Sequence, residues 1–524
     1  MSSAHAAADL APIRQPAPAR STLLLEWTPA RTVIALIVVT ACIRLVAAAV
    51  LGLGVDESYT VGNARTLAWS YVDYPPLHVW LVGVWSWFWG SESAIVVRLP
   101  FILLFAGSTW LMFRMTARLF DETAGLWAAV LLNVMPVFTL PHASWVLPDG
   151  PLAFFSLGAA YVTASLLFDG TERKASVARW VLAGFLAGLA LLCKYHAAFL
   201  VLGIFVFLLT TPDKRRLLAT KGPWLAAAAV LVMSAPVLIW NAQHGWIGVS
   251  FQAKRVHSFM HPDVLRMLSY AGEQALYLAP WLFLPLAFVL GRALWRGPSA
   301  QRSWFLALIA VGPIVFFTAA SLFARGLPHW PMPGWLFAIP LLGAETALLA
   351  QRHGRLVRYG VAATGALIFV ALVLVASEGA TGWLVSSPTA EAAQSDPTLE
   401  MLNWTEVKQV LAQRELLNGG TAAIAGTNWI EAGKLNYAVG SDIPVLCLCA
   451  DPQQFRYSRN VSDFAGQTVL VIQSRDRLSK SRALLAKQFR QLQPLAGITL
   501  HRANRPAIDL VVLRGIGFAP ETKS

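Results

Sequence analysis

Charged residues are scarce in this chain. Asp, Glu, Lys and Arg together make up 13% of its 524 residues, whereas hydrophobic residues make up 56%. In a typical soluble domain, about a quarter of all residues are charged and cover its surface. The composition therefore excludes an ordinary soluble enzyme and indicates a protein embedded in a lipid bilayer.

Cysteine is also scarce, with four in the whole chain. Cys42 and Cys193 lie in or beside apolar segments, and Cys447 and Cys449 alternate within one apolar run. Two cysteines so close together in a strand are not expected to bridge each other easily. The sequence therefore predicts neither a disulfide framework nor a cysteine metal site.

The net charge of +13 does not form one continuous basic face. Basic residues stand in short clusters between apolar segments, for example Lys214-Arg215-Arg216. Such clusters are the orientation signal of a multi-pass membrane protein, since cytoplasmic loops carry an excess of Lys and Arg. We therefore expect membrane lipids as partners and no nucleic acid.

Apolar runs long enough to cross a bilayer recur along the chain. We expect about eleven transmembrane helices with the N-terminus in the cytoplasm. The spans lie near residues 32–54, 94–113, 123–142, 150–168, 178–193, 196–210, 223–240, 268–290, 303–323, 332–350 and 358–377. Residues 77–90 are short and contain four tryptophans, so this piece is predicted to lie near the outer surface instead of spanning.

The C-terminal region has an ordinary soluble composition. Thr421–Thr427, Pro444–Cys449, Thr468–Gln473 and Ile508–Leu513 are predicted as strands, with helices at Ile430–Val439 and Lys480–Leu492. Alternating strands and helices predict a small α/β domain that covers the outer face of a polytopic α-helical membrane protein.

This pattern divides the chain into three parts. We predict a disordered cytoplasmic N-terminus at 1–30, a transmembrane catalytic domain at 31–377 and a periplasmic α/β domain at 378–524. The outer loops of the catalytic domain are then 55–93, 143–149, 241–267 and 324–331.

Acids and bases collect on these outer loops. The first loop carries three carboxylates, Asp56, Glu57 and Asp73, and cations follow on later loops. A pocket that sets carboxylates beside cations suits an oxygen nucleophile that attacks while a phosphate leaves. The acid orients or deprotonates the nucleophile, and the cations stabilise the departing phosphate.

Several motifs on these loops resemble a known family. Asp56-Glu57-x-Tyr59, Tyr71-x-Asp73-Tyr74-Pro75-Pro76-Leu77 and Arg98-Leu99-Pro100 resemble the first-loop motifs of polyprenyl-phosphate-sugar-dependent glycosyltransferases of the GT-C type. That group includes the protein O-mannosyltransferases and the lipid A aminoarabinose transferases. Further matches are Pro148-Asp149, Lys194-Tyr195, Phe251-Gln252 with Arg255, and His329-Trp330-Pro331, so the resemblance covers roughly residues 30–340. The chain departs from the family pattern at Ser58, Tyr74 and His329.

The resemblance implies a hexosyl or pentosyl transferase of the bacterial inner membrane. Its donor would be a sugar on a polyprenyl phosphate, and its acceptor a lipid of the lipid A or lipopolysaccharide type, or a protein, on the periplasmic side. Inversion at the anomeric carbon is typical of the family. The implied catalytic residues are Asp56, Glu57 and Asp149. The implied substrate-binding residues are Tyr59, Asp73, Lys194, Tyr195, Arg255, His257 and His329, with Lys194 and Arg255 on the lipid phosphate.

Purely structural roles are open for several of these residues. Glu57 could be an acid favoured at a helix N-terminus, and Asp149 could be an N-cap. Arg44, inside the first span, is predicted to brace the bundle through an interior ion pair. The sequence identifies no certain cofactor, and Asp56 and Asp149 could hold a divalent metal beside a phosphate.

Two other functions fit a polytopic protein. The first is a transporter or flippase of lipid-linked sugars, which should show polar or broken helices near the bilayer midplane. The second is a polymerase or ligase of surface polysaccharide. We favour the transferase because the ionisable residues collect at one face.

Overall fold

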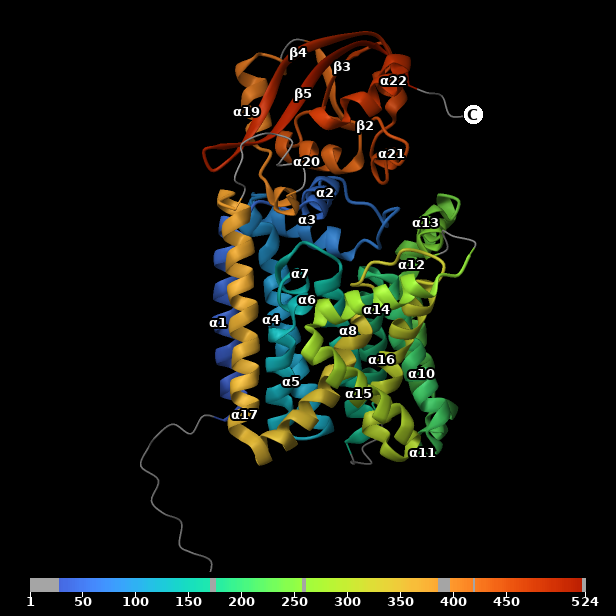
Figure 1. Ribbon diagram of the computed structural model, residues 1–524. Coiled ribbons are helices and arrows are strands. Elements are labelled where there is room, and N and C mark those ends of the chain that lie inside the picture. The colour runs from blue at the N-terminus through green and yellow to red at the C-terminus, as the bar shows by residue number, and fades with distance from the viewer. Residues whose placement is uncertain (1–27, 170–175, 257–260, 385–395, 418–419, 521–524) are drawn as a thin grey trace, which may run out of the picture.

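The computed structural model describes residues 28–169, 176–256, 261–384, 396–417 and 420–520. A bundle of long helices carries a smaller domain built on a β-sheet at one end (Figure 1). We call residues 396–520 the cap domain. This arrangement confirms the predicted fold class. Residues 1–27 of the segment predicted as disordered (1–30) lie outside the described residues, and a helix already begins at Pro29.

The helical part runs from the start of α1 to the end of α17. Its longer helices are α1 Pro29–Val50, α2 Val55–Ala64, α3 Leu77–Trp89, α4 Ala94–Leu119, α5 Glu122–Val134, α8 Asp149–Phe168, α9 Val177–Cys193, α10 Ala198–Thr210, α12 Lys221–Gln243, α13 Ile247–Val256, α14 Val264–Leu278, α15 Pro280–Arg296, α16 Gln301–Ala320 and α17 Met332–Thr381. Short helices are α6 Pro136–Thr139, α7 Pro141–Ser144, η1 Tyr195–Ala197, α11 Pro212–Arg215, η2 Arg216–Ala219 and η3 Gly297–Ala300.

The chain is a multi-pass membrane protein. Within the described residues, six helices are long and apolar enough to cross a bilayer, or up to eight if each of two bent pairs counts as one span. The expected number of eleven therefore stays a prediction. One expected span, 268–290, is in fact two helices, because Ala279 adopts a positive φ of 68° and Pro280 starts a new helix.

α17 contains two of the expected spans in one run. His353 has non-helical backbone angles (φ −132°, ψ 48°) and bends the helix between the predicted spans 332–350 and 358–377. The second half leads up to the cap domain (Figure 1). α3, the tryptophan-rich piece, lies at that same end of the bundle, as predicted for a helix near the surface.

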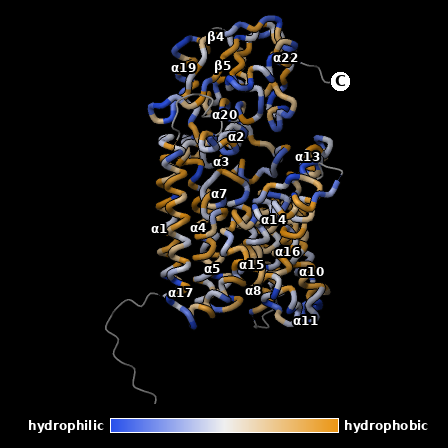
Figure 2. The backbone as a smooth tube through the Cα atoms, viewed as in Figure 1, coloured by the Kyte–Doolittle hydropathy of each residue, from blue (hydrophilic) through white to orange (hydrophobic). Residues whose placement is uncertain are grey.

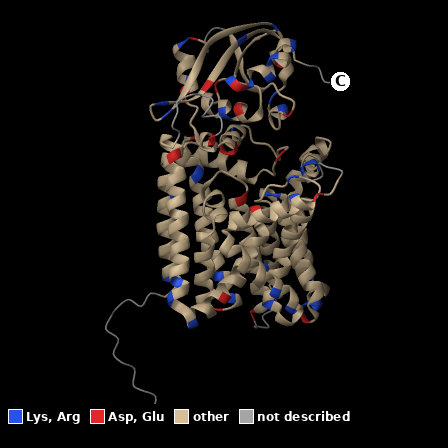
Figure 3. Cartoon of the chain, viewed as in Figure 1, with Lys and Arg blue, Asp and Glu red and all other residues tan. Residues whose placement is uncertain are grey.

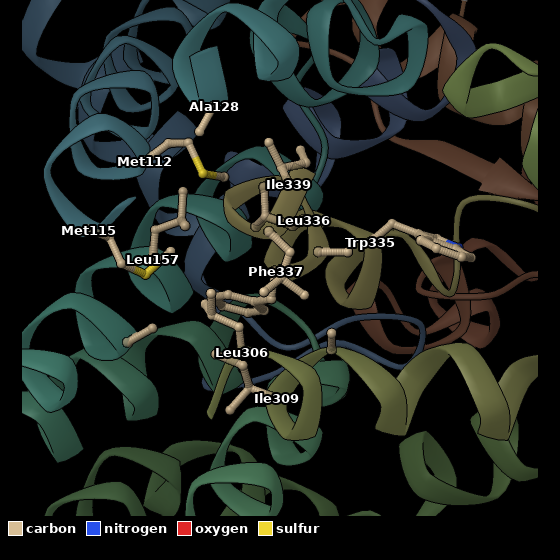
Figure 4. Packing of buried hydrophobic residues seen from close by; sticks show 14 of the residues in the cluster. Met112, Met115, Ala128, Leu157, Leu306, Ile309, Trp335, Leu336, Phe337 and Ile339 are labelled. Atoms are coloured by element: carbon tan, nitrogen blue, oxygen red, sulfur yellow. The ribbon is translucent and has the colours of Figure 1, made fainter. Parts of the chain in front are cut away.

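Side chains from several helices interlock in the centre of the bundle. Met112 and Met115 of α4 meet Leu157 of α8 and the α17 residues Leu336 and Phe337 (Figure 4). Figure 2 shows that hydrophobic residues dominate the helices, whereas the cap domain is much more hydrophilic. The bundle therefore has its core inside and an apolar surface outside, as a lipid environment requires.

The cap domain contains a five-stranded sheet of order β2-β1-β3-β5-β4. β1 pairs in parallel with β2 and β3, and β5 pairs antiparallel with β3 and β4. The elements are η4 Pro397–Met401, α19 Glu406–Gln413, β1 Thr421–Gly426, α20 Trp429–Val439, β2 Val445–Cys447, α21 Phe455–Ser458, η5 Val461–Phe464, β3 Thr468–Ser474, η6 Arg475–Arg477, α22 Leu478–Gln488, β4 Phe489–Arg502 and β5 Arg505–Phe518.

Two predictions for the cap domain were wrong. The helix predicted at Lys480–Leu492 ends at Gln488, and the edge strand β4 follows it directly. Cys447 and Cys449 form a disulfide with their Cα atoms 5.5 Å apart. β2 ends at Cys447, so the next residues leave the strand and the two sulfurs meet.

Candidate functional site

α2 presents two neighbouring acids to different surroundings. It begins directly after Gly54, with Asp56 and Glu57 in its first turn. Successive residues on a helix do not face the same way. Asp56 accordingly lines a cavity, whereas Glu57 points at Arg98 of α4.

Glu57 is held in a buried ion pair. Arg98 Nε lies 2.8 Å from Glu57 Oε1, and Arg98 Nη2 lies 2.5 Å from Oε2. The backbone N–H groups of Gly54 and Val146 donate to the same carboxylate. Despite its burial, these bonds lower the pKa of Glu57. Glu57 is outside the cavity wall, so the geometry favours the structural role over the catalytic one.

A cavity of about 770 Å³ lies where the helical bundle meets the cap domain. Its wall combines carboxylates and cations from distant loops with apolar side chains. The lining residues used below are Asp56, Asp73, Tyr74, Val137, Leu140, His142, Asp149, Phe251, Arg255, Leu276, Tyr277, Leu327, His329, Leu372, Trp429, Asp451 and Gln453. The cavity thus brings four of the predicted outer loops together.

Two carboxylates of the first loop share the polar part of this cavity. Burial raises the pKa of Asp56 to about 6, helped by the negative charge of Glu400 and opposed by Arg255. Burial also raises the pKa of Asp73 to about 6. The backbone carbonyl of Asp73 accepts a hydrogen bond of 2.5 Å from Gln252, which joins the first loop to α13. A carboxylate with a pKa near neutrality is suited to exchange a proton.

Asp149 and Lys194 form a second buried pair. Asp149 starts α8, and its Oδ1 accepts a hydrogen bond of 2.9 Å from Lys194 Nζ. His142 Nε2 lies 3.7 Å from the same oxygen. Gly150 lets α8 start this close to α7, because a Cβ there would lie 2.5 Å from the His142 carbonyl oxygen. Asp149 lines the cavity and Lys194 is not among the residues of its wall.

Arg255 supplies positive charge to the cavity wall. Its guanidinium lies 5.6 Å from the ring centre of Phe251 and 5.5 Å from that of Trp330. Among the described residues, no carboxylate is within ion-pair distance of it. His329 lines the same wall, and burial lowers its pKa to about 3, so it is uncharged at neutral pH. Aromatic rings therefore hold Arg255 without neutralising it.

Other predicted binding residues lie away from the wall. The Tyr59 hydroxyl accepts from the backbone N–H of Gln454, and its ring packs on Trp429 of the cap domain. Tyr195 begins η1 after Lys194 and is outside the wall. His257 lies outside the described residues.

Arg44 braces the bundle with neutral partners. Its Nη2 donates to Asn133 Oδ1 at 3.0 Å and to the Thr139 hydroxyl at 3.1 Å, and its guanidinium covers the ring of Phe105. The predicted interior ion pair was therefore wrong, although the predicted bracing role fits.

Sequence reasoning missed the cap-domain part of the wall. Trp429, Asp451 and Gln453 reach the cavity from loops and a helix start of the α/β domain. His142 was also missed, although its place at the end of the expected span 123–142, shortly before Asp149, could have pointed to it. The described residues contain no group of three or more His, Cys, Asp or Glu side chains placed to hold a metal ion.

Comparisons with known proteins agree with the geometry. A family model described as dolichyl-phosphate-mannose-protein mannosyltransferase matches residues 73–240. The chain is 24% identical to the lipid A galacturonosyltransferase RgtD of Rhizobium johnstonii over 54% of this chain and 58% of that one. It is 29% identical to the undecaprenyl phosphate-α-4-amino-4-deoxy-L-arabinose arabinosyl transferase of Pseudomonas aeruginosa over 53% of this chain and 50% of that one. The match thus spans about half the length of these relatives.

The fold is shared over almost the whole chain. The crystal structure of ArnT from Cupriavidus metallidurans in the apo state superposes with a TM-score of 0.60 at 15% identity, covering 94% of this chain and all of that one. Its complex with undecaprenyl phosphate superposes with a TM-score of 0.58 at 16% identity. Together, the sequence and fold matches confirm the resemblance to GT-C type glycosyltransferases that the first-loop motifs carry.

Proposed function

We propose that this protein is a membrane glycosyltransferase that moves a sugar from a polyprenyl phosphate to an acceptor outside the cytoplasm. The acceptor is a lipid of the lipid A or lipopolysaccharide type, or a protein. One observation carries the proposal: a single cavity joins Asp56 and Asp73 to Arg255 and continues into an apolar wall.

The two kinds of wall suit the two parts of such a donor. The side chains of Val137, Leu140, Leu276, Leu327 and Leu372 offer apolar surface to an isoprenoid chain. The carboxylates and Arg255 offer polar groups to the sugar and its phosphate. The relatives named above and the undecaprenyl-phosphate complex of a protein with this fold support the same donor class.

The reaction assigns a task to each charged group. The acceptor oxygen forms a bond to the anomeric carbon while the bond from that carbon to the phosphate oxygen breaks, so inversion is expected. Asp56 takes the proton of an acceptor hydroxyl, and Arg255 stabilises the phosphate that leaves with the electron pair. If the acceptor is itself a phosphate, there is no proton to take and Asp56 only orients the sugar.

The Asp149–Lys194 pair has a different task from the one first predicted for Lys194. Lys194 is paired with Asp149 and is not among the residues of the wall, so we assign the phosphate to Arg255 first. Lys194 then holds Asp149 in place in the cavity wall. A divalent metal at Asp56 and Asp149 would have to compete with Lys194 for one of these carboxylates.

We place the protein in the bacterial inner membrane with its N-terminus in the cytoplasm and residues 378–524 in the periplasm. Two observations support this orientation. Lys and Arg side chains gather at the end of the bundle opposite the cap domain (Figure 3). The Cys447–Cys449 disulfide lies in the cap domain, and disulfides persist on the oxidising side of the membrane.

Replacing Asp56 by Asn tests the proposal. The assay measures transfer of a radiolabelled sugar from undecaprenyl phosphate to lipid A by the purified protein in detergent. Loss of a general base lowers kcat by about 10²–10⁴-fold. Asp213→Asn is the matched control, because Asp213 is an acid of α11 at the other end of the bundle, and its activity should stay at the wild-type level. Full activity of a folded Asp56→Asn protein would remove Asp56 from the mechanism.

A further inference from the structure

The cap domain forms part of the wall of the proposed donor cavity. Trp429 lies at the start of α20, and Asp451 and Gln453 lie on the loop between β2 and α21. These residues line the same cavity as the bundle residues Asp56 and Asp73. A sugar held near Asp56 is therefore enclosed by the cap domain as well as by the bundle.

The loop that carries Asp451 is fixed in place from both sides. The Gln454 backbone N–H donates to the Tyr59 hydroxyl at 3.0 Å, and the Gln454 side chain accepts from the Val72 backbone N–H at 3.1 Å. Gln453 adopts a φ of 49°, which residues other than glycine rarely adopt. The Cys447–Cys449 disulfide closes the start of the loop. Asp451 thus sits on a well-anchored segment.

The charges of the wall do not cancel. Asp149 is matched by Lys194, and Arg255 is the cation that remains for the leaving phosphate. Asp56, Asp73 and Asp451 then have no further Lys or Arg opposite them among the described residues of the wall. The cavity wall therefore keeps a net negative charge when its carboxylates are ionised.

We propose that Asp451 and the cap-domain loop select the donor by the charge of its sugar, favouring a protonated amino sugar and rejecting a uronic acid. This inference rests on the proposed function, and it names the substrate class of the same cavity. An ammonium group gains from the carboxylates, whereas a sugar carboxylate is repelled by each of them. A neutral sugar is bound with intermediate affinity.

Binding of lipid-linked sugars to the full chain tests the selection without an acceptor. The purified protein in phosphatidylcholine nanodiscs is titrated at pH 7 with radiolabelled undecaprenyl phosphate alone. It is then titrated with the same lipid carrying 4-amino-4-deoxy-arabinose, galactose or galacturonic acid. Galactose and galacturonic acid share one ring skeleton and differ in charge. We expect the amino sugar to bind at least tenfold more tightly than the uronic acid.

Substitutions of Asp451 test which residue makes the selection. Asp451→Asn keeps the size of the side chain and should lower the preference of amino sugar over uronic acid about three- to fivefold, the size of one partly exposed charge interaction. Asp451→Lys should shift this preference further toward the uronic acid. Asp442→Asn is the matched control, since Asp442 is an exposed cap-domain acid paired with Lys408 outside the cavity.

The outcomes separate the two proposals. Failure to bind undecaprenyl phosphate at all would overturn the proposed donor and, with it, the selection. Binding of undecaprenyl phosphate with equal affinities for the amino and uronic sugars would overturn the selection alone. A preference that Asp451→Asn leaves unchanged would remove Asp451 as its cause.

Discussion

Replacing Glu57 by Gln should lower the stability of the folded protein without abolishing sugar transfer. Glu57 and Arg98 are 2% and 3% exposed, and the pair is joined by two short hydrogen bonds. The glutamine amide is neutral, so the buried Arg98 guanidinium loses its anionic partner and is left with neutral acceptors, among them the carbonyl oxygens of Leu51 and Gly52. Breaking a buried pair by removing one partner costs about 3–5 kcal/mol. For a chain of 524 residues, the apparent Tm in detergent should therefore fall by roughly 3–5 °C.

A double-mutant cycle isolates the pair. Glu57→Gln, Arg98→Met and the double variant should show a coupling energy of about 1–3 kcal/mol. The Arg65–Glu92 pair is the control, because its side chains are 13% and 35% exposed. Glu92→Gln should cost about 1 kcal/mol or less.

The transfer rate of the folded fraction decides between the two roles of Glu57. We expect Glu57→Gln to lower that rate by less than about tenfold, whereas removing a catalytic acid or base costs about 10²–10⁴-fold. An unchanged Tm together with a rate loss of that larger size would refute the structural assignment of Glu57.

Three further predictions concern the proposed base Asp56 and the cap domain. Burial raises the pKa of Asp56 to about 6, so transfer to a hydroxyl acceptor should fall about tenfold per pH unit below that value; a flat profile between pH 5 and 8 would contradict a base role. Lys434 donates to three backbone carbonyls, including that of Leu53 at 2.5 Å, so Lys434→Met should increase hydrogen exchange in α20; unchanged exchange would show that this contact does not hold the cap domain. Cys447 and Cys449 should resist alkylation in cells until a reductant is added, and free thiols would contradict a periplasmic cap domain.

The positions of the long helices could be predicted because a bilayer span needs only a long apolar run. The break at Ala279 could not, since alanine gives no local signal for a positive φ. β4 was missed because its exposed and half-buried residues alternate irregularly along an edge of the sheet and Pro494 interrupts the run. Local sequence therefore located the elements better than it located their ends.

The gathering of Asp56, Asp73, Asp149 and Arg255 could also be predicted, because it depends only on which loops share one side of the bundle. Which acid pairs with which cation depends on distances of a few ångströms between side chains. Nothing in the sequence separates Asp56 on the cavity from its neighbour on the helix. The cap-domain residues of the wall were out of reach, since their place depends on how two domains pack.

The most direct test of the central claim is an electron cryomicroscopy structure of the full chain in nanodiscs with undecaprenyl phosphate. The account predicts the phosphate beside Arg255 in the cavity that Asp56 lines, with the isoprenoid chain along the apolar wall near Leu276 and Leu372. A phosphate bound at the opposite end of the bundle, or a lipid that leaves this cavity empty, would contradict it.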